Sequence, residues 1–169
     1  VAGPIERASN LLPQILTTRV FSHEQGVDGL RLILWGLFKK IVIADSIAWR
    51  VDYCFQNYSS LDGGTLFLGL IYFSFQLYCD FSGYSDIAIG TAKLFGLELM
   101  SNFRFPLFAL NVHQFWERWH ISLTSWLKDY IYTPLALNFI RKGKSFYNVN
   151  IAFAITWLLT GLWHGANYT

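Results

Sequence analysis

Charged side chains are scarce in this sequence of 169 residues. Asp, Glu, Lys and Arg together supply 14% of it, whereas soluble domains carry about 25%. Hydrophobic residues reach 53% and aromatic residues 18%, and a soluble domain of this size would have difficulty hiding so much apolar surface. A bilayer removes the difficulty, because lipid-facing side chains can be apolar while Trp and Tyr favour its interfaces. We therefore expect a membrane protein.

Cysteine and an excess of positive charge are also lacking. Cys54 and Cys79 are the only cysteines, and they form neither a C-x-x-C pair nor a disulfide framework. The formal net charge of +2 is small and the basic residues are scattered, so we expect no nucleic-acid partner. The chain begins at Val1 without a signal peptide and ends in an uncharged stretch. We therefore expect residues 1–169 to be an internal fragment of one domain.

Two stretches without charge are predicted to cross the membrane as helices, which requires about 20 mostly apolar residues. The clearer stretch is Ser145 to Thr169, and the second is Gly63 to Cys79. A basic turn from Arg141 to Lys144 precedes the first of them. By the positive-inside tendency, that turn should lie in the cytoplasm.

Charged helices are expected between these spans. Leu30 to Val51 consists of two short apolar halves around Lys39 and Lys40. We expect this segment to re-enter the membrane or to lie at its interface, with both lysines reaching the headgroups. Charge at membrane depth is tolerated where it lines a wet cavity, as in an enzyme or a transporter.

Two further helices are predicted from turn and proline signals. Tyr84 to Leu97 should form a separate helix after a break at Ser82-Gly83, and Asn111 to Tyr132 should form a polar helix that Pro134 ends. Asp80 and Asp86, on either side of the predicted break, would then share no helix face. Their simplest interpretation is a capped helix–turn–helix at the membrane interface.

Two histidines follow tryptophans, His120 after Trp119 and His164 after Trp163. A histidine titrates near neutrality, so it can take a proton from a hydroxyl nucleophile and return it to a leaving group. Small residues around His164 would let a substrate approach the imidazole. The alternative is a structural histidine at a helix end, hydrogen-bonded to a backbone carbonyl.

A metal site is the other chemistry that the pattern suggests. His113, Glu117 and His120 would share one face of a continuous helix, and Glu-x-x-His occurs in di-iron bundles. Such sites need further ligands from partner helices, and few remain in this sequence. We expect no bound metal, and a Glu117–His120 pair is more simply a structural hydrogen bond.

Taken together, the motifs resemble the membrane-bound O-acyltransferase family, in particular its bacterial branch that modifies cell-surface polymers. The resemblance covers nearly the whole chain. The segments that carry it are Ala2–Ile5, Gly36–Asp45, Asp80–Gly90, Asn102–Phe103, Phe115–Leu123, Trp126–Tyr130 and Thr160–Ala166.

The resemblance implies an all-α, multi-pass membrane fold, in which many helices form a ring around a thinned centre. It implies that His164 is the general base and that His120 orients the donor or completes a proton path. Asp80 and Asp86, with Trp119 and Trp163, would shape the channel between donor and acceptor.

The resemblance also implies an enzyme of the bacterial cytoplasmic (inner) membrane that O-acetylates an exported, alginate-like polysaccharide. The acyl donor would be acetyl-CoA or an acyl-carrier thioester, with no resident cofactor. Besides membrane lipid, the expected partner is the polysaccharide itself or a periplasmic or extracellular protein that passes the acyl group on. The rival interpretations are a transporter or channel subunit with a cavity lined by His and Asp, and a metal-dependent membrane oxidase.

Overall fold

The structure, a computed structural model, describes residues 3–20, 22–141 and 147–165. Contacts divide the chain into two compact units, Val1–Phe103 and Arg104–Thr169. Every regular element in the described part is a helix. The all-α class expected from the sequence is therefore confirmed for these residues.

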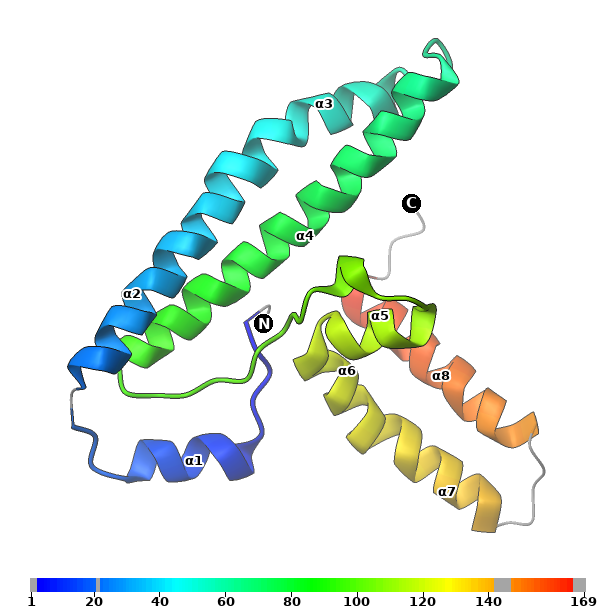
Figure 1. Ribbon diagram of the computed structural model, residues 1–169. Coiled ribbons are helices and arrows are strands. Elements are labelled where there is room, and N and C mark those ends of the chain that lie inside the picture. Colours follow the sequence, from blue (N-terminus) through cyan, green and yellow to red (C-terminus); the bar gives the residue numbers. More distant parts are fainter. Residues whose placement is uncertain (1–2, 21, 142–146, 166–169) are drawn as a thin grey trace. The chain divides into compact units, whose positions relative to one another are not determined.

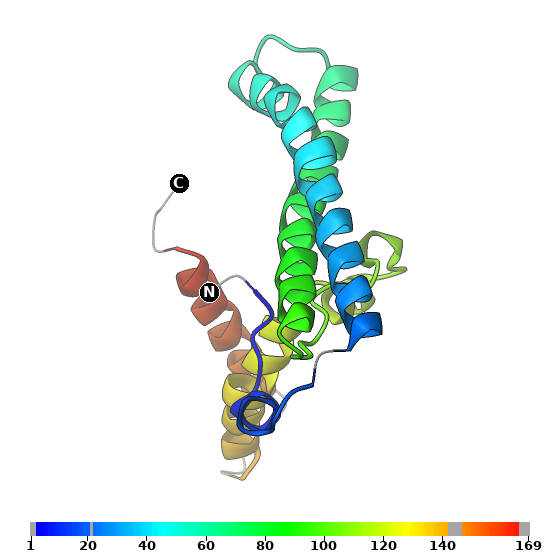
Figure 2. The ribbon, with the colours of Figure 1, turned by 90° about the vertical axis from the view of Figure 1, so that its left-hand side faces the viewer.

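The first unit is built on a long helical hairpin. One arm continues from α2 (His23–Leu37) through the π-helical turn η1 (Phe38–Ala44) into α3 (Asp45–Gln56), and the other arm is α4 (Gly63–Leu94). Figures 1 and 2 show the two arms side by side and antiparallel. The short helix α1 (Ala8–Leu16) precedes them.

The arm formed by α4 is more continuous than the sequence predicted. The break expected at Ser82-Gly83 is wrong, because both residues are buried within α4, where their small size serves packing. The segment Leu30 to Val51 is continuous as well, since its backbone continues through η1. Its two lysines are paired with carboxylates of α4, so the charge does not force the helix apart.

Glycines bring the two arms into backbone contact. A Cβ atom at Gly36 would lie 2.5 Å from the carbonyl oxygen of Gly83, and one at Gly83 would lie 2.7 Å from that of Gly36. Gly29 and Gly90 form a second such pair, at 2.7 and 2.5 Å. A side chain at any of these positions would push the arms apart, so the glycines set the distance between the helices, as small residues do in membrane helix pairs.

The segment that follows α4 ties α1 to the hairpin. The amide of Gln14 donates to the carbonyl of Glu98 at 3.1 Å and accepts from the Glu98 N–H at 2.7 Å, while the Glu6 carboxylate accepts from the N–H of Met100. Asn102 is buried and donates to Ser85 Oγ of α4 at 2.8 Å. The polar side chains of this segment thus find partners within the unit.

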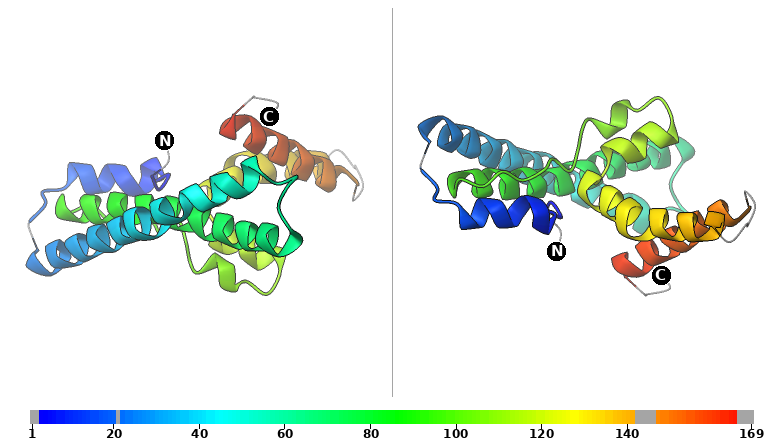
Figure 3. Two further views of the ribbon diagram at one scale, coloured as in Figure 1. Left: turned by 90° about the horizontal axis from the view of Figure 1, so that it is seen from above. Right: turned by 90° about the horizontal axis from the view of Figure 1, so that it is seen from below.

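The second unit consists of shorter helices. Its elements are the 3-10 turn η2 (Pro106–Phe108), α5 (Val112–Arg118), α6 (Ile121–Leu127), the π-helical turn η3 (Lys128–Tyr132), α7 (Thr133–Arg141) and α8 (Tyr147–His164). The stretch α6–η3–α7 is continuous, and α8 packs back against η3 and α7 (Figures 1 and 3).

Pro134 does not end the helix that precedes it, contrary to the prediction. It is the second residue of α7 and follows η3, where the N–H of Thr133 donates to the carbonyl of Lys128. In a regular α-helix, the proline ring would clash with the carbonyl four residues earlier. The wider π-helical turn relieves that clash, and the helix continues.

The predicted membrane-crossing segments are described only in part. Gly63 to Cys79 forms the first half of α4, and α8 covers most of Ser145 to Thr169. Residues 142–146 and 166–169, which include most of the predicted basic turn, lie outside the described residues. Among the residues that are described, no helix is both long enough and apolar enough to cross a membrane. Neither predicted span is therefore confirmed.

We expect Gly36→Ala to destabilise the protein, because the added methyl group would overlap the carbonyl oxygen of Gly83. Overpacking costs about 1–3 kcal/mol, which exceeds the gain of at most about 1 kcal/mol from replacing a helical glycine with alanine. Thermal unfolding of the full-length protein in detergent measures the difference. Gly161→Ala in α8 is the matched control, since nothing lies within 4 Å of a Cβ atom there, and it should unfold at or above the wild-type temperature. An unchanged Tm for Gly36→Ala would contradict the contact.

Candidate functional site

His120 occupies a break between two helices. The helix α5 ends at Arg118, Trp119 is extended, and His120 adopts a left-handed backbone with φ 45° and ψ 51° before α6 begins. Left-handed backbone is uncommon for residues other than glycine, although histidine is one of the types in which it is enriched. The continuous helix predicted from Asn111 to Tyr132 is therefore wrong, and the break turns His120 away from the face of α5.

The imidazole of His120 is buried, with 7% of the residue exposed. Burial, and to a lesser extent the charge of His164, lowers the pKa of His120 from 6.5 to about 4. The ring is therefore neutral at physiological pH. A neutral imidazole has one nitrogen that donates and one that accepts, so it can orient a polar group or pass on a proton.

His164 is the last residue of α8 and is exposed within its unit. Because its charge acts on His120, the two histidines predicted to be catalytic lie near each other in the second unit. The tryptophans that precede them are held by ring contacts, with centroid distances of 6.4 Å for Trp163–Trp126 and 5.5 Å for Trp119–Phe115. The second unit thus contains four of the predicted site residues, His120, His164, Trp119 and Trp163.

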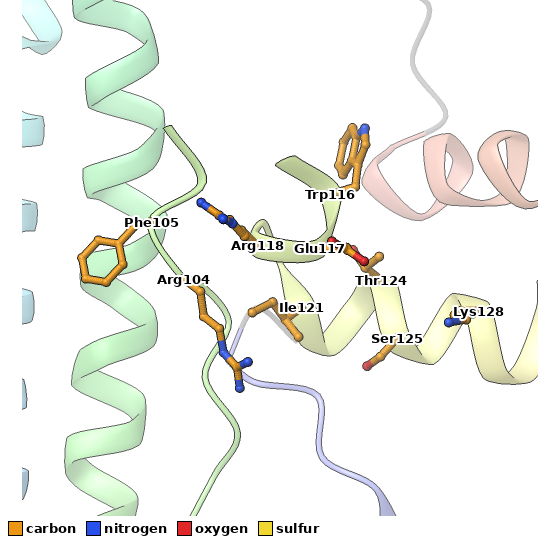
Figure 4. A pocket seen from close by; sticks show the side chains of 9 residues that line it. All are labelled: Arg104, Phe105, Trp116, Glu117, Arg118, Ile121, Thr124, Ser125 and Lys128. Atoms are coloured by element: carbon orange, nitrogen blue, oxygen red, sulfur yellow. The ribbon is translucent and has the colours of Figure 1, made fainter. Parts of the chain in front are cut away.

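A pocket of about 720 Å³ opens beside this region of the second unit. Figure 4 shows the side chains that line it: Arg104, Phe105, Trp116, Glu117, Arg118, Ile121, Thr124, Ser125 and Lys128. Neither histidine lines the pocket, although its residues flank His120 in the sequence on both sides. Sequence reasoning missed this pocket, because Arg104 comes from a loop that has no helical or strand periodicity.

Asp80 and Asp86 belong to the first unit, where both lie on α4 and each binds a lysine. The distance between Lys39 Nζ and Asp86 Oδ2 is 2.7 Å, and that between Lys40 Nζ and Asp80 Oδ1 is also 2.7 Å. The prediction that both lysines reach lipid headgroups is therefore wrong for Lys39, which is buried against α4. Both lie in η1, whose wider turn lets two consecutive residues face α4.

These two ion pairs differ in burial. The Lys39 and Asp86 side chains are 9% and 22% exposed, and Lys39 also donates to Ser82 Oγ at 3.0 Å. The Lys40 side chain is 43% exposed and contacts Asp45 at 2.8 Å as well. The pattern of four charges in otherwise apolar helices was visible in the sequence. Their pairing was not, because it depends on how the two arms align.

The alternative metal site does not form in the described part of the chain. His113 Nε2 lies 3.3 Å from Glu117 Oε1 on α5, but His120 follows the end of that helix in left-handed backbone. Within the ranges that the structure describes, no three His, Cys, Asp or Glu side chains gather closely enough to hold a metal ion.

In the part of the chain that the structure describes, the regular elements are helices and both histidines lie in one unit, which fits the class of protein that the motifs resemble. The model of the MBOAT, membrane-bound O-acyltransferase family, matches residues 1–169. The chain belongs to this family, and the resemblance found in the sequence is confirmed.

Three relatives show which activities are named for proteins similar to this chain. The chain is 42% identical over its whole length to a protein named probable alginate O-acetylase AlgI from Pseudomonas putida, and 40% identical to a peptidoglycan O-acetyltransferase from Helicobacter pylori. It is 28% identical over 97% of its length to a teichoic acid D-alanyltransferase from Bacillus subtilis. These matches cover 34%, 32% and 43% of the relatives, so the chain spans about a third of the length of the first two.

The lowered pKa of His120 predicts a loss of stability in acid. An unfolded histidine titrates near 6.5 and the folded one near 4, so the unfolded state binds the proton first as the pH falls. The free energy of unfolding therefore decreases as the pH falls from about 6.5 to about 4, by at most about 1.4 kcal/mol per pH unit. Melting temperatures of wild type and His120→Asn at pH 7 and pH 5 measure the effect. Asparagine tolerates the left-handed backbone, so this variant should show the weaker pH dependence, and equal dependence would contradict the assignment.

Removal of Lys39 should cost more stability than removal of Lys40. Lys39→Ala leaves the half-buried Asp86 carboxylate without this partner. Breaking a fully buried pair costs about 3–5 kcal/mol, so we expect a smaller loss here, but one that exceeds the contribution of about 0–1 kcal/mol from an exposed pair. Equilibrium unfolding of the two full-length variants measures the difference. The double variant Lys39→Met/Asp86→Leu removes both charges and should recover part of the loss. Equal effects of the two single variants would show that burial does not distinguish the pairs.

Proposed function

We propose that the full-length protein is an O-acyltransferase that acetylates hydroxyl groups of an exported cell-surface polysaccharide. The observation that carries this proposal is the family match over residues 1–169. Two relatives at 40% identity or more are named for O-acetyl transfer, to alginate and to peptidoglycan. The relative named for D-alanyl transfer to teichoic acid indicates that the same fold accepts different acyl groups and polymers.

In the proposed reaction, His164 takes the proton of the acceptor hydroxyl while the oxygen attacks the carbonyl carbon of a thioester. The carbon–sulfur bond then breaks, and the thiolate leaves with the proton that His164 returns. The exposed position of His164 at the end of α8 supports this role, since a substrate can reach the imidazole. Glycines on both sides, Gly161 and Gly165, leave room for it.

His120 is proposed as a positioning residue in the same reaction. Its burial and its neutral state favour a fixed hydrogen-bonding role over direct contact with the acceptor. It would orient the donor or complete the proton path from His164. In this proposal the accessible His164 exchanges protons, and the buried His120 orients the reacting groups.

The setting proposed for this chemistry is the inner membrane of a bacterium. The family is membrane-bound by description, and 53% of the residues are hydrophobic. The donor would be cytosolic acetyl-CoA or an acyl-carrier thioester. The acceptor would be the polysaccharide, or a partner protein outside the membrane that passes the acetyl group on.

We expect His164→Ala in the full-length protein to reduce polymer acetylation by about 10²–10⁴-fold, the usual contribution of a general base. His120→Asn should cause a smaller loss, because it removes the imidazole but keeps the backbone. The O-acetyl content of exported polysaccharide from cells that carry each variant is the measurement. Membrane levels of the protein, followed by immunoblot, separate lost activity from lost protein.

His113→Ala is the matched control for these variants. His113 lies in the same unit, but 85% of its side chain is exposed, and it contacts Glu117 at 3.3 Å on the surface of α5. Acetylation should stay at the wild-type level. Normal acetylation by His164→Ala would instead make His164 a structural histidine, and solute flux without any acetylated product would favour the transporter interpretation.

A further inference from the structure

A threonine hydroxyl reaches back across the break at His120. Thr124 lies in α6 (Figure 4), and its Oγ1 donates to the carbonyl of Trp119, five residues earlier, at 3.2 Å. In a regular helix a threonine hydroxyl bonds the carbonyl three or four residues earlier, as those of Thr156 and Thr160 do in α8. The bond of Thr124 spans one residue more, because it crosses the point at which the chain changes direction.

The main chain of Thr124 adds a second bond on the other side of the histidine. Its N–H donates to the carbonyl of His120 at 2.9 Å. The carbonyl of Trp119 belongs to the planar peptide group before His120, and the carbonyl of His120 belongs to the peptide group after it. Thr124 therefore binds both of the peptide groups whose relative orientation is set by φ and ψ of His120.

These two bonds act on an uncommon backbone conformation. His120 has φ 45° and ψ 51°, in the left-handed region that residues with a Cβ atom rarely adopt. Such a conformation persists where the surrounding contacts over-determine it. The same two angles fix the direction in which the side chain leaves the backbone, so the burial of the imidazole depends on them.

We propose that Thr124 is a positioning residue for His120, because its hydroxyl and its N–H fix the backbone on both sides of the histidine and thereby keep the imidazole in place. Thr124→Val removes the hydroxyl donor but keeps the size and the branched Cβ atom, and its N–H can still bind the carbonyl of His120. The effect of Thr124 on acyl transfer rests on the role proposed for His120, whereas its effect on the position of the imidazole does not.

The position of the imidazole is tested with diethyl pyrocarbonate, which modifies accessible neutral histidines. Peptide mass spectrometry of the full-length protein in detergent measures the rate at which His120 is modified. Thr124→Val should raise this rate by about two- to tenfold, the change in an equilibrium that one net hydrogen bond produces. Thr124→Ser keeps the hydroxyl and should react as wild type does. Thr124→Ala also lacks the donor and serves if the valine variant does not accumulate.

His113 and Thr156 supply the controls for this measurement. The side chain of His113 is 85% exposed, so its rate of modification should be the same in every variant. Thr156→Val removes a hydroxyl bond to a backbone carbonyl within α8, away from the break, and should leave the rate at His120 unchanged. An unchanged rate at His120 in Thr124→Val, or an equal rise in Thr156→Val, would overturn the proposal.

Acetylation of exported polysaccharide is the second readout. Thr124→Val should lower it toward the level of His120→Asn, and Thr124→Ser should recover it. The double variant His120→Asn/Thr124→Val should fall no lower than His120→Asn alone, because Thr124 acts through the histidine.

Two outcomes separate this proposal from the proposed function. A further loss in the double variant would show that Thr124, which lines the pocket, contacts the substrate itself, and would overturn its role as a positioning residue. Faster modification of His120 in Thr124→Val, with normal acetylation in both Thr124→Val and His120→Asn, would overturn the role proposed for His120 in acyl transfer, and would still support the control of the imidazole position by Thr124.

Discussion

The contact between two helix backbones is the constraint on which the first unit depends. Where Gly36 meets Gly83, a Cβ atom would come within 2.5 Å of a carbonyl oxygen, so no other residue type fits without separating the arms. The close approach has a chemical consequence, because it places the Lys39 ammonium within 2.7 Å of the Asp86 carboxylate. A wider spacing would leave both charges in an apolar environment, where an unpaired ion is costly. The Lys39–Asp86 ion pair therefore depends on the close approach that the glycines allow.

The second unit depends on a different feature, the left-handed backbone of the single residue His120. At His120 the chain leaves one helix direction and enters another, and the imidazole is buried as a result. The same break exposes residues on either side of it to the pocket. A neutral, buried histidine and an exposed histidine at a helix end thus arise from local chain geometry.

Sequence patterns identified the helical class of the described residues and the family, because each of these depends on composition or on short local motifs, while the roles of His120 and His164 stay predictions. They failed where one residue type has two uses. The pattern predicts a helix break at Gly83, but this residue serves a close contact with the other arm. It also predicts that Pro134 ends a helix, but a π-helical turn accommodates the proline. The pairing of Lys39 with Asp86 and the approach of Arg104 to Arg118 depend on tertiary alignment, which no local pattern contains.

The nested contacts of the hairpin also imply an order of assembly. Cys54 touches Gly69 close to the connecting loop, the lysines of η1 meet the aspartates of α4 farther away, and Gly29 meets Gly90 farthest from the loop. Each contact that forms shortens the chain segment that the next one must close, so the entropy cost of closure is spread over small steps. A hairpin whose contacts are nested in this way can therefore close stepwise from its loop, with only a short segment left to order at each step.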